Sequence, residues 1–193
     1  MRSRTPPSDR VHLKQNPPPN TYPKSMSKND TTQTIEQIEN GMSSADREGS
    51  IAVLSEVLAN QHVLYIKTRN FHWNLKGARF TSLHEFFEKQ YDELALAIDE
   101  TAERIRMLGG VAPGSMAEFL GGASLKEASS VIIDGQEAAQ ALLEDHSSVI
   151  RELRDQIPRC EDDFGDVGSG DFLTELLQKH EQAAWMLRSL LED

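Results

Sequence analysis

Helix-breaking residues are distributed very unevenly along this chain. Six of the eight prolines lie between Pro6 and Pro23, so the remainder is almost free of them. Because proline removes a backbone donor and clashes with the preceding turn, only the remainder can form long helices. The opening segment is also rich in Ser, Thr, Asn and Gln and poor in large apolar side chains. We therefore predict a disordered, Pro-rich, basic tail over residues 1–45 and one folded domain over residues 46–193.

Apolar residues recur at helical spacing in four later segments of the chain. The segments run from Ile51 to about Leu75, from Ser82 to Leu108, from Ala138 to Ile157 just before Pro158, and from Leu173 to Leu191. Within the second segment, Ser82 and Glu85 resemble a capping box, which predicts that a helix begins there. Gly109-Gly110 marks the end of that helix.

The connection between the second and third segments is long and rich in Gly and Pro. It covers residues 109–130 and carries a small apolar cluster, Met116, Phe119 and Leu120, which predicts one or two helical turns. Four helices with one long middle connection are typical of a ferritin-like bundle and not of a plain up-and-down bundle. The predicted fold is an all-α, ferritin-like four-helix bundle with a short extra helix between helices two and three.

Charge divides the chain in the same way. The first 29 residues carry a net charge of +5 within a total of −11, which leaves −16 on the rest. A body this acidic repels nucleic acids, so any DNA contact would run through the tail. The basic side chains available for it are Arg2, Arg4, Arg10, Lys14, Lys24 and Lys28.

Other features of the composition indicate the compartment. Cys160 is the only cysteine, so no intrachain disulfide can form. No apolar run approaches the roughly 20 residues that span a bilayer, and the opening segment lacks the apolar stretch of a secretory signal. We expect a cytoplasmic protein that contacts no membrane, nucleoid-associated if it binds DNA. Met26 is an alternative start, which would remove most of the tail.

Four polar residues of the second segment share one helix face. At about 100° per residue, Glu88, Asp99 and Glu103 lie about 40°, 60° and 100° from His84. The apolar stripe of the same helix lies between about −40° and −100°, so the polar face is turned away from the bundle interior. Such a face is usually just solvated surface. The alternative is a metal site beside the core.

The spacing along the helix limits how such a site could be built. Glu88 and Asp99 are separated by about 16 Å along the helix axis, too far to share one metal ion. If two copies of the helix pack antiparallel about a twofold axis, the His84 end of one meets the Asp99 end of the other. Ala95, near the middle of this face, would allow the close approach.

His72 can fold back toward His84 through the turn at residues 76–82, giving two imidazoles and three carboxylates. Imidazole with carboxylate oxygen suits ferrous iron, with manganese or zinc as substitutes, and the absence of thiolates disfavours a structural zinc or iron–sulfur site. Three other histidines, His62, His146 and His180, are expected to be surface or satisfied polar residues, as is Cys160. Trp73 and Trp185 are expected to be packing residues.

Four motifs of the sequence belong together. They are Phe71-His72-Trp73-Asn74, Leu83-His84-Glu85-Phe86-Phe87-Glu88, Ile98-Asp99-Glu100-Thr101-Ala102-Glu103-Arg104 and Leu108-Gly109-Gly110. In this combination the chain resembles the Dps family, the DNA-protecting proteins of starved cells. The resemblance implies a dodecameric shell of four-helix subunits that oxidises ferrous iron, preferably with hydrogen peroxide, and stores ferric mineral. It implies that His72, His84 and Glu88 of one subunit face Asp99 and Glu103 of its twofold mate. Typical members carry Asp at the position of Glu88.

The C-terminal part of the chain resembles the same family, over residues 165–173 and 180–188. There the family lines its iron-entry pores with acidic residues at the start of the last helix. The resemblance therefore implies pore roles for Asp166 and Asp171, with Asp162 and Asp163 nearby. The alternative is that these carboxylates only stabilise the helix N-terminus.

Two rival functions remain open at this point. An ordinary ferritin or bacterioferritin binds iron inside the bundle through Glu-x-x-His pairs, but no such pair occurs in this sequence. A structural DNA-compacting protein with little ferroxidase activity would act through the basic tails, whose charge is multiplied in an oligomer.

Overall fold

The computed structural model describes residues 38–128, 130 and 132–192. Most of the predicted tail, with Met26 and the six basic residues expected to contact DNA, lies outside these residues. The described part forms five α-helices and one π-helical turn: α1 (Ser44–Asn74), α2 (Phe80–Met107), α3 (Met116–Gly122), α4 (Gly135–Pro158), η1 (Arg159–Asp163) and α5 (Val167–Leu191).

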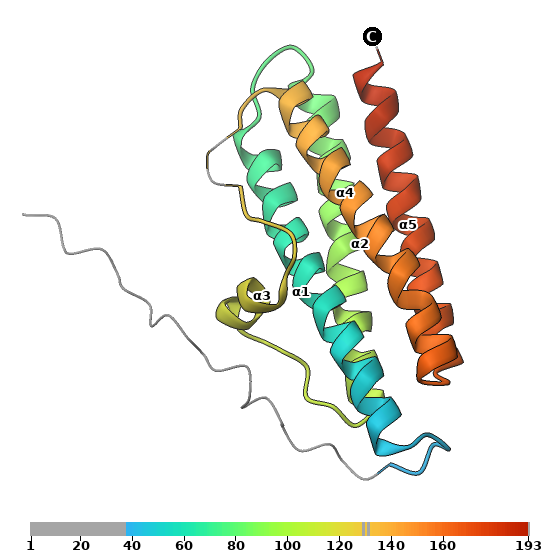
Figure 1. The fold of residues 1–193 in the computed structure, drawn as a ribbon. Helices are drawn as coiled ribbons and strands as arrows, with labels where there is room; N and C mark the ends of the chain where they lie inside the picture. The colour runs from blue at the N-terminus through green and yellow to red at the C-terminus, as the bar shows by residue number, and fades with distance from the viewer. Residues whose placement is uncertain (1–37, 129, 131, 193) are drawn as a thin grey trace, which may run out of the picture. The chain divides into compact units, whose positions relative to one another are not determined.

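The four long helices form two antiparallel pairs, which pack into one bundle (Figure 1). α1 packs chiefly on α2, and α4 packs chiefly on α5. The short helix α3 lies beside α1, within the long connection from α2 to α4. The predicted all-α, ferritin-like bundle with an extra helix in its long connection is confirmed.

Local capping explains where most helices begin. The Ser43 side chain accepts a hydrogen bond from the Asp46 backbone and starts α1 seven residues before the predicted start at Ile51. The predicted capping box of Ser82 is wrong, because α2 begins at Phe80 and the Ser82 hydroxyl donates to the Arg79 carbonyl instead. The complete capping box lies at the start of α3.

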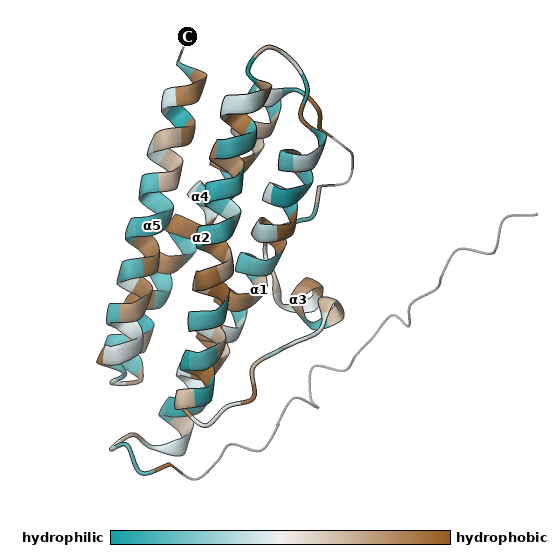
Figure 2. Ribbon diagram, turned by 180° about the vertical axis from the view of Figure 1, so that it is seen from behind, coloured by the Kyte–Doolittle hydropathy of each residue, from teal (hydrophilic) through white to brown (hydrophobic). Residues whose placement is uncertain are grey.

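The bundle interior is built from apolar faces of all four long helices. Hydrophobic and hydrophilic residues alternate along each helix, as expected for helices with one buried face (Figure 2). Burying one such side chain contributes about 1.5–3 kcal/mol. The largest fully buried side chains include Leu54, Phe71, Phe87, Ile105, Leu142, Leu153, Leu173 and Leu187. None of the helices in the described ranges combines the length and apolar character needed to cross a membrane.

Asn60 on α1 fixes the long connection to the bundle. Its side-chain oxygen accepts hydrogen bonds from the backbone N–H groups of Ser124 and Leu125, at 2.9 and 3.0 Å. Its amide nitrogen donates to the Glu152 carboxylate at 2.7 Å, which ties α1 to α4. One buried amide therefore satisfies backbone groups that would otherwise lose their hydrogen bonds.

Candidate metal centre

The turn between α1 and α2 brings two histidines together. Gly77 lies in this turn with φ of +112°, a conformation that residues with a side chain rarely adopt. His72, near the end of α1, and His84, near the start of α2, stack with ring centroids 3.7 Å apart and planes 18° from parallel. The predicted return of His72 toward His84 is therefore observed.

Reciprocal hydrogen bonds fix the orientation and tautomer of the two rings. Nδ1 of His72 lies 2.8 Å from the backbone oxygen of His84, and Nδ1 of His84 lies 2.9 Å from that of His72. A carbonyl oxygen can only accept, so each Nδ1 carries the proton and donates it. Each Nε2 then keeps a free lone pair. Metal-ligating histidines are oriented in this way, with the second ring nitrogen bonded to a carbonyl or carboxylate.

Glu88 lies one turn after His84, beside a tyrosine that the sequence analysis did not single out. The Tyr91 hydroxyl donates to the Glu88 carboxylate at 3.5 Å, and its ring meets the His72 ring edge to face, with centroids 5.2 Å apart. Burial, and then the negative charges of Glu88 and Asp92, raise the pKa of Tyr91. Tyr91 thus remains a neutral donor at pH 7. The sequence could have indicated this contact, because Tyr91 follows Glu88 by three residues and therefore lies on the same helix face.

Arg69 packs the aromatic side chains around this histidine pair. Its guanidinium carbon lies 5.3, 4.8 and 5.4 Å from the ring centroids of Tyr65, Trp73 and Tyr91. It also donates a hydrogen bond to the Tyr65 hydroxyl at 2.8 Å. Trp73 and Trp185 were predicted to be packing residues, but in the single subunit they are 62% and 59% exposed. The cation–π contact with Arg69 orders Trp73 without burying it.

Asp99 and Glu103, the other two predicted ligands, are exposed near the far end of α2. Ala95, the small residue predicted between the two groups, is exposed as well. Among residues 38–128, 130 and 132–192, no three His, Cys, Asp or Glu side chains lie close enough to hold a metal ion. A single subunit thus brings His72 and His84 together but leaves Asp99 and Glu103 more than about 20 Å further along the helix.

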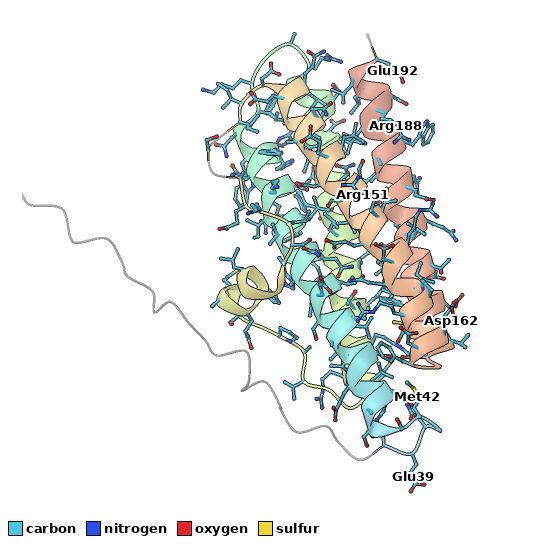
Figure 3. The ribbon with its side chains drawn as sticks, viewed as in Figure 1. Glu39, Met42, Arg151, Asp162, Arg188 and Glu192 are labelled. Atoms are coloured by element: carbon cyan, nitrogen blue, oxygen red, sulfur yellow. The ribbon has the colours of Figure 1, made fainter. Side chains whose placement is uncertain are left out.

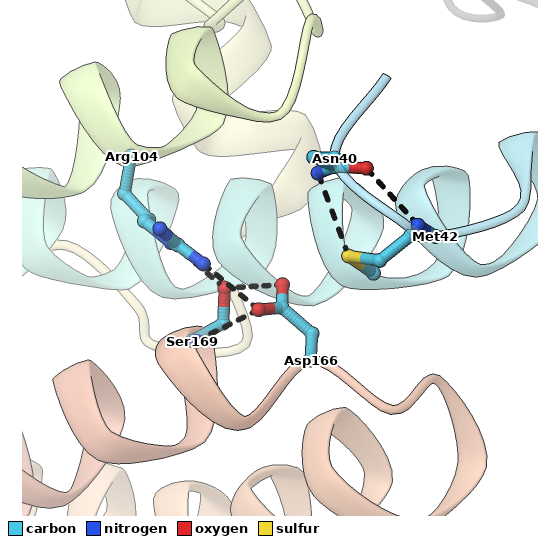
Figure 4. Close-up of polar contacts among 5 residues, drawn as sticks. All are labelled: Asn40, Met42, Arg104, Asp166 and Ser169. Atoms are coloured by element: carbon cyan, nitrogen blue, oxygen red, sulfur yellow. Dashed lines mark hydrogen bonds and ion pairs between the residues drawn. The ribbon is translucent and has the colours of Figure 1, made fainter. Parts of the chain in front are cut away.

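Asp166, predicted at an iron-entry pore, is the N-cap of α5 and is 4% exposed. Its carboxylate accepts from the Ser169 backbone at 3.0 Å and hydroxyl at 2.6 Å, and pairs with the Arg104 guanidinium at 2.8 Å (Figure 4). Burial raises the pKa of Asp166, but the Ser169 hydrogen bonds and the Arg104 charge outweigh it and hold the pKa below its usual value. This environment favours the alternative role, stabilisation of the helix N-terminus.

The other acidic residues near the start of α5 remain open to solvent. Asp171, one turn into the helix, is exposed, as are Asp162 and Asp163 in the π-helical turn before it. Asp162 lies at the same end of the bundle as Met42, opposite Glu192 (Figure 3). Asp171 therefore keeps the free carboxylate that a pore role requires, whereas Asp166 does not.

Comparison with known proteins identifies the family. The ferritin-like domain matches residues 51–193. A low-temperature-induced protein of Nostoc sp. is 43% identical over 152 residues, covering 79% of this chain and 85% of that protein. DNA protection during starvation protein 2 of Bacillus anthracis is 37% identical over 142 residues, covering 73% and 95%. The Dps structure of Vibrio cholerae O1 superposes with a TM-score of 0.76 at 31% identity, covering 83% of this chain and 100% of that one. The chain belongs to the Dps family.

Membership of the Dps family supports iron storage and DNA protection as the kind of function. The Vibrio cholerae protein is described as a ferritin-like diiron-carboxylate protein, and this superfamily implies that the chain binds iron. Among the described residues of this Dps chain, the histidine pair at the α1–α2 turn is the part that already has the geometry of metal ligands.

Two further histidines are buried inside the bundle. His146 on α4 and His180 on α5 were expected to be surface or satisfied polar residues, and at 3% and 4% exposed they are not on the surface. Their Nδ1 atoms are 2.9 Å apart and share one hydrogen bond, whereas Nε2 of His146 is buried without a hydrogen-bond partner among the described residues. His62, for which the same was expected, is half-buried, and its ring stacks on that of Phe119 in α3 with centroids 3.5 Å apart.

Proposed function

We propose that this protein oxidises ferrous iron, preferably with hydrogen peroxide, at sites shared between twofold-related subunits of a dodecameric cage. The ferric product is stored as mineral inside, which keeps iron and peroxide away from DNA. The observation that carries this proposal is the oriented pair of His72 and His84. Two imidazoles present free Nε2 lone pairs, with Glu88 one helical turn after His84, while no group of three potential metal ligands forms among the described residues of one subunit.

The twofold arrangement follows from the positions of the ligands on α2. Asp99 and Glu103 lie on the same helix face as His84 and Glu88, but even Glu88 and Asp99, which are nearest in sequence, are about 16 Å apart along the axis. An antiparallel copy of α2 would bring its Asp99 end to the His84 end of the first copy, and the symmetry would create two equivalent sites. Each site would then have two imidazoles and three carboxylates, a mixed set that suits ferrous iron and admits zinc or manganese.

The chemistry assigned to the site is a two-electron reaction. Two ferrous ions each give one electron to one hydrogen peroxide, the O–O bond breaks, and two protons complete two water molecules. No hydroxyl radical forms when both electrons are delivered together. The protein binds and positions the substrate ions, while the redox chemistry belongs to iron. Glu88 is one methylene longer than the Asp of typical members, so its carboxylate extends further from the helix backbone.

The route of iron into the cage is assigned to the exposed carboxylates near the start of α5. Asp171 is the leading candidate, because the Asp166 carboxylate is already taken up by Arg104 and Ser169. Asp162 and Asp163 add negative charge nearby. A concentration of negative charge attracts divalent cations before they reach the ferroxidase site.

DNA binding is assigned to the basic tail, because the rest of the chain carries a charge of −16. Binding through phosphate contacts weakens steeply with salt. We expect strong, salt-sensitive binding by the full-length oligomer and much weaker binding after removal of residues 1–29. Unchanged binding by the truncated oligomer would exclude the tail, and with it the DNA-compacting alternative that depends on the tail.

The ferroxidase is tested by stopped-flow oxidation of ferrous iron with peroxide in the assembled oligomer. The double variant His84→Ala/Asp99→Ala should oxidise iron far more slowly than the parent, with its assembly confirmed by size. Glu100→Ala is the matched control, since Glu100 is an exposed carboxylate adjacent to Asp99 that pairs with Lys179 at 3.4 Å instead. Equal rates in the parent and the double variant would refute the site and leave a passive cage.

A further inference from the structure

Tyr91 contacts two of the residues that are predicted to bind iron, although it is not a predicted ligand itself. Its hydroxyl donates to Oε1 of Glu88 at 3.5 Å, and its ring meets the His72 ring edge to face, with planes 82° apart. Glu88 belongs to α2 and His72 to α1, so this one side chain contacts candidate ligands from both helices. A side chain in such a position can fix where the two ligands lie relative to each other.

A second set of contacts holds the Tyr91 ring in place. The Arg69 guanidinium carbon lies 5.4 Å from its centroid, and the Tyr65 ring meets it edge to face with centroids 6.2 Å apart. Arg69 and Tyr65 are themselves joined by a hydrogen bond of 2.8 Å. Tyrosine has few side-chain torsions, so contacts on the ring leave its hydroxyl little freedom. The Tyr91 hydroxyl is therefore a donor with a fixed position.

Glu88, by contrast, is exposed and has a long, flexible side chain. Ordering such a side chain on an ion costs conformational entropy, which weakens binding. The Tyr91 hydroxyl donates to Oε1, and a carboxylate accepts at both oxygens, so Oε2 is left to bind an ion. The separation of 3.5 Å is long beside the usual O–H···O length of about 2.7–2.8 Å. Hydrogen bonds in active sites are often long before the substrate binds and shorten in the complex.

We propose that Tyr91 is a positioning residue of the shared iron site, where it orders the Glu88 carboxylate beside the His72 ring before iron binds. The role of Tyr91 rests on the proposed function, because it concerns the same site. Residues that hydrogen-bond to ligating side chains orient them, and their loss costs about 10–100-fold in metal affinity or activity. A residue that only orders a ligand changes how tightly iron is bound and leaves the oxidation of bound iron unchanged.

Tyr91→Phe tests this role in the assembled oligomer, because it removes the hydroxyl and keeps the ring beside His72. Isothermal titration with zinc measures binding without oxidation, at the sites that are lost in the His84→Ala/Asp99→Ala oligomer. We expect the affinity of these sites to fall about tenfold. In stopped-flow oxidation, the half-saturating iron concentration should rise by a similar factor, while the maximal rate at saturating iron stays at the parental value.

Two further variants separate the contact with Glu88 from a general effect on packing. Tyr65→Phe is the matched control, since it removes the hydroxyl that accepts from Arg69 instead of the one that donates to Glu88. Its zinc affinity should stay close to the parental value. Glu88→Ala completes a double-mutant cycle, in which Tyr91→Phe should cause no further loss of zinc affinity once the carboxylate is absent. A Tyr91 that only supports the fold would cause the same loss in both backgrounds.

The outcomes distinguish this proposal from the proposed function. If the parent oxidises iron and Tyr91→Phe binds zinc as tightly as the parent, the positioning role is overturned and the ferroxidase stands. An equal loss of affinity with and without the Glu88 carboxylate also overturns the positioning role. If the parent does not oxidise iron, the ferroxidase is refuted, and the zinc cycle alone still decides whether Tyr91 orders Glu88.

Discussion

Replacing Asp166 with alanine tests the role that the structure gives this carboxylate. The change removes the N-cap of α5, which costs about 1 kcal/mol. It also removes a charged acceptor from Arg104, a loss of about 1.5–3 kcal/mol that is reduced because the Arg104 side chain is 24% exposed and can rehydrate. We expect a total loss of about 2–3 kcal/mol. Asp166→Asn keeps a capping oxygen, so it should cost about half as much.

The assay is guanidinium denaturation followed by circular dichroism, at one subunit concentration because oligomer stability depends on it. Asp171→Ala is the matched control, since Asp171 is an exposed carboxylate one turn further along α5. Its free energy of unfolding should change by less than about 0.5 kcal/mol. The reasoning is refuted if Asp166→Ala is no more destabilising than this control.

The parent and Asp166→Asn should also differ in how their stability depends on pH. The folded-state pKa of Asp166 lies below its usual value, so its contribution to stability is fully present above the usual Asp pKa. That contribution is lost as the pH falls through the lowered, folded-state value. The parent should therefore lose stability in this acidic window more steeply than Asp166→Asn. Identical acid profiles would show that the carboxylate is not stabilised by folding.

Three further changes probe the turn, the long connection and the proposed site. Gly77→Ala should destabilise the protein by about 1–3 kcal/mol and slow iron oxidation, because φ of +112° is strained for alanine. In the control Gly114→Ala the added methyl group meets only open space, so the thermal melting temperature should stay at the parental value. Asn60→Ala should lower the free energy of unfolding by about 1–3 kcal/mol and increase proteolysis near Ser124, because the Ser124 N–H loses its acceptor. Cleavage as slow as in the parent would contradict this prediction. Glu88→Asp should change the half-saturating iron concentration and leave assembly intact; an unchanged titration would show that carboxylate reach is unimportant.

Much of the fold was readable from the sequence, because long helices with one apolar face leave a regular signal. All four long helices end within about one residue of their predicted ends, and the apolar cluster at Phe119 is a short helix. The first turns of α1 were missed because residues 44–50 carry no large apolar side chain. The Ser82 capping box was wrong because the tight turn at Gly77 lets α2 begin earlier.

The candidate site was predictable only where its residues are close in sequence. His72 and His84 are 12 residues apart on either side of one short turn, so their meeting follows from local geometry. Arg104 and Asp166 are 62 residues apart, and His146 and His180 are 34 apart. Such pairs depend on how α2, α4 and α5 pack, and a single sequence does not encode this in any local pattern.

Mixing two inactive variants tests the shared ferroxidase most directly. Oligomers of His84→Ala alone and of Asp99→Ala alone should each be inactive, since every site lacks one ligand. If each site combines His84 of one subunit with Asp99 of its twofold mate, a mixed pair contains one site with both changes and one intact site. Random co-assembly in equal amounts should then restore about a quarter of the parental rate of iron oxidation. Mixed oligomers of confirmed composition that remain inactive would contradict a site shared between subunits.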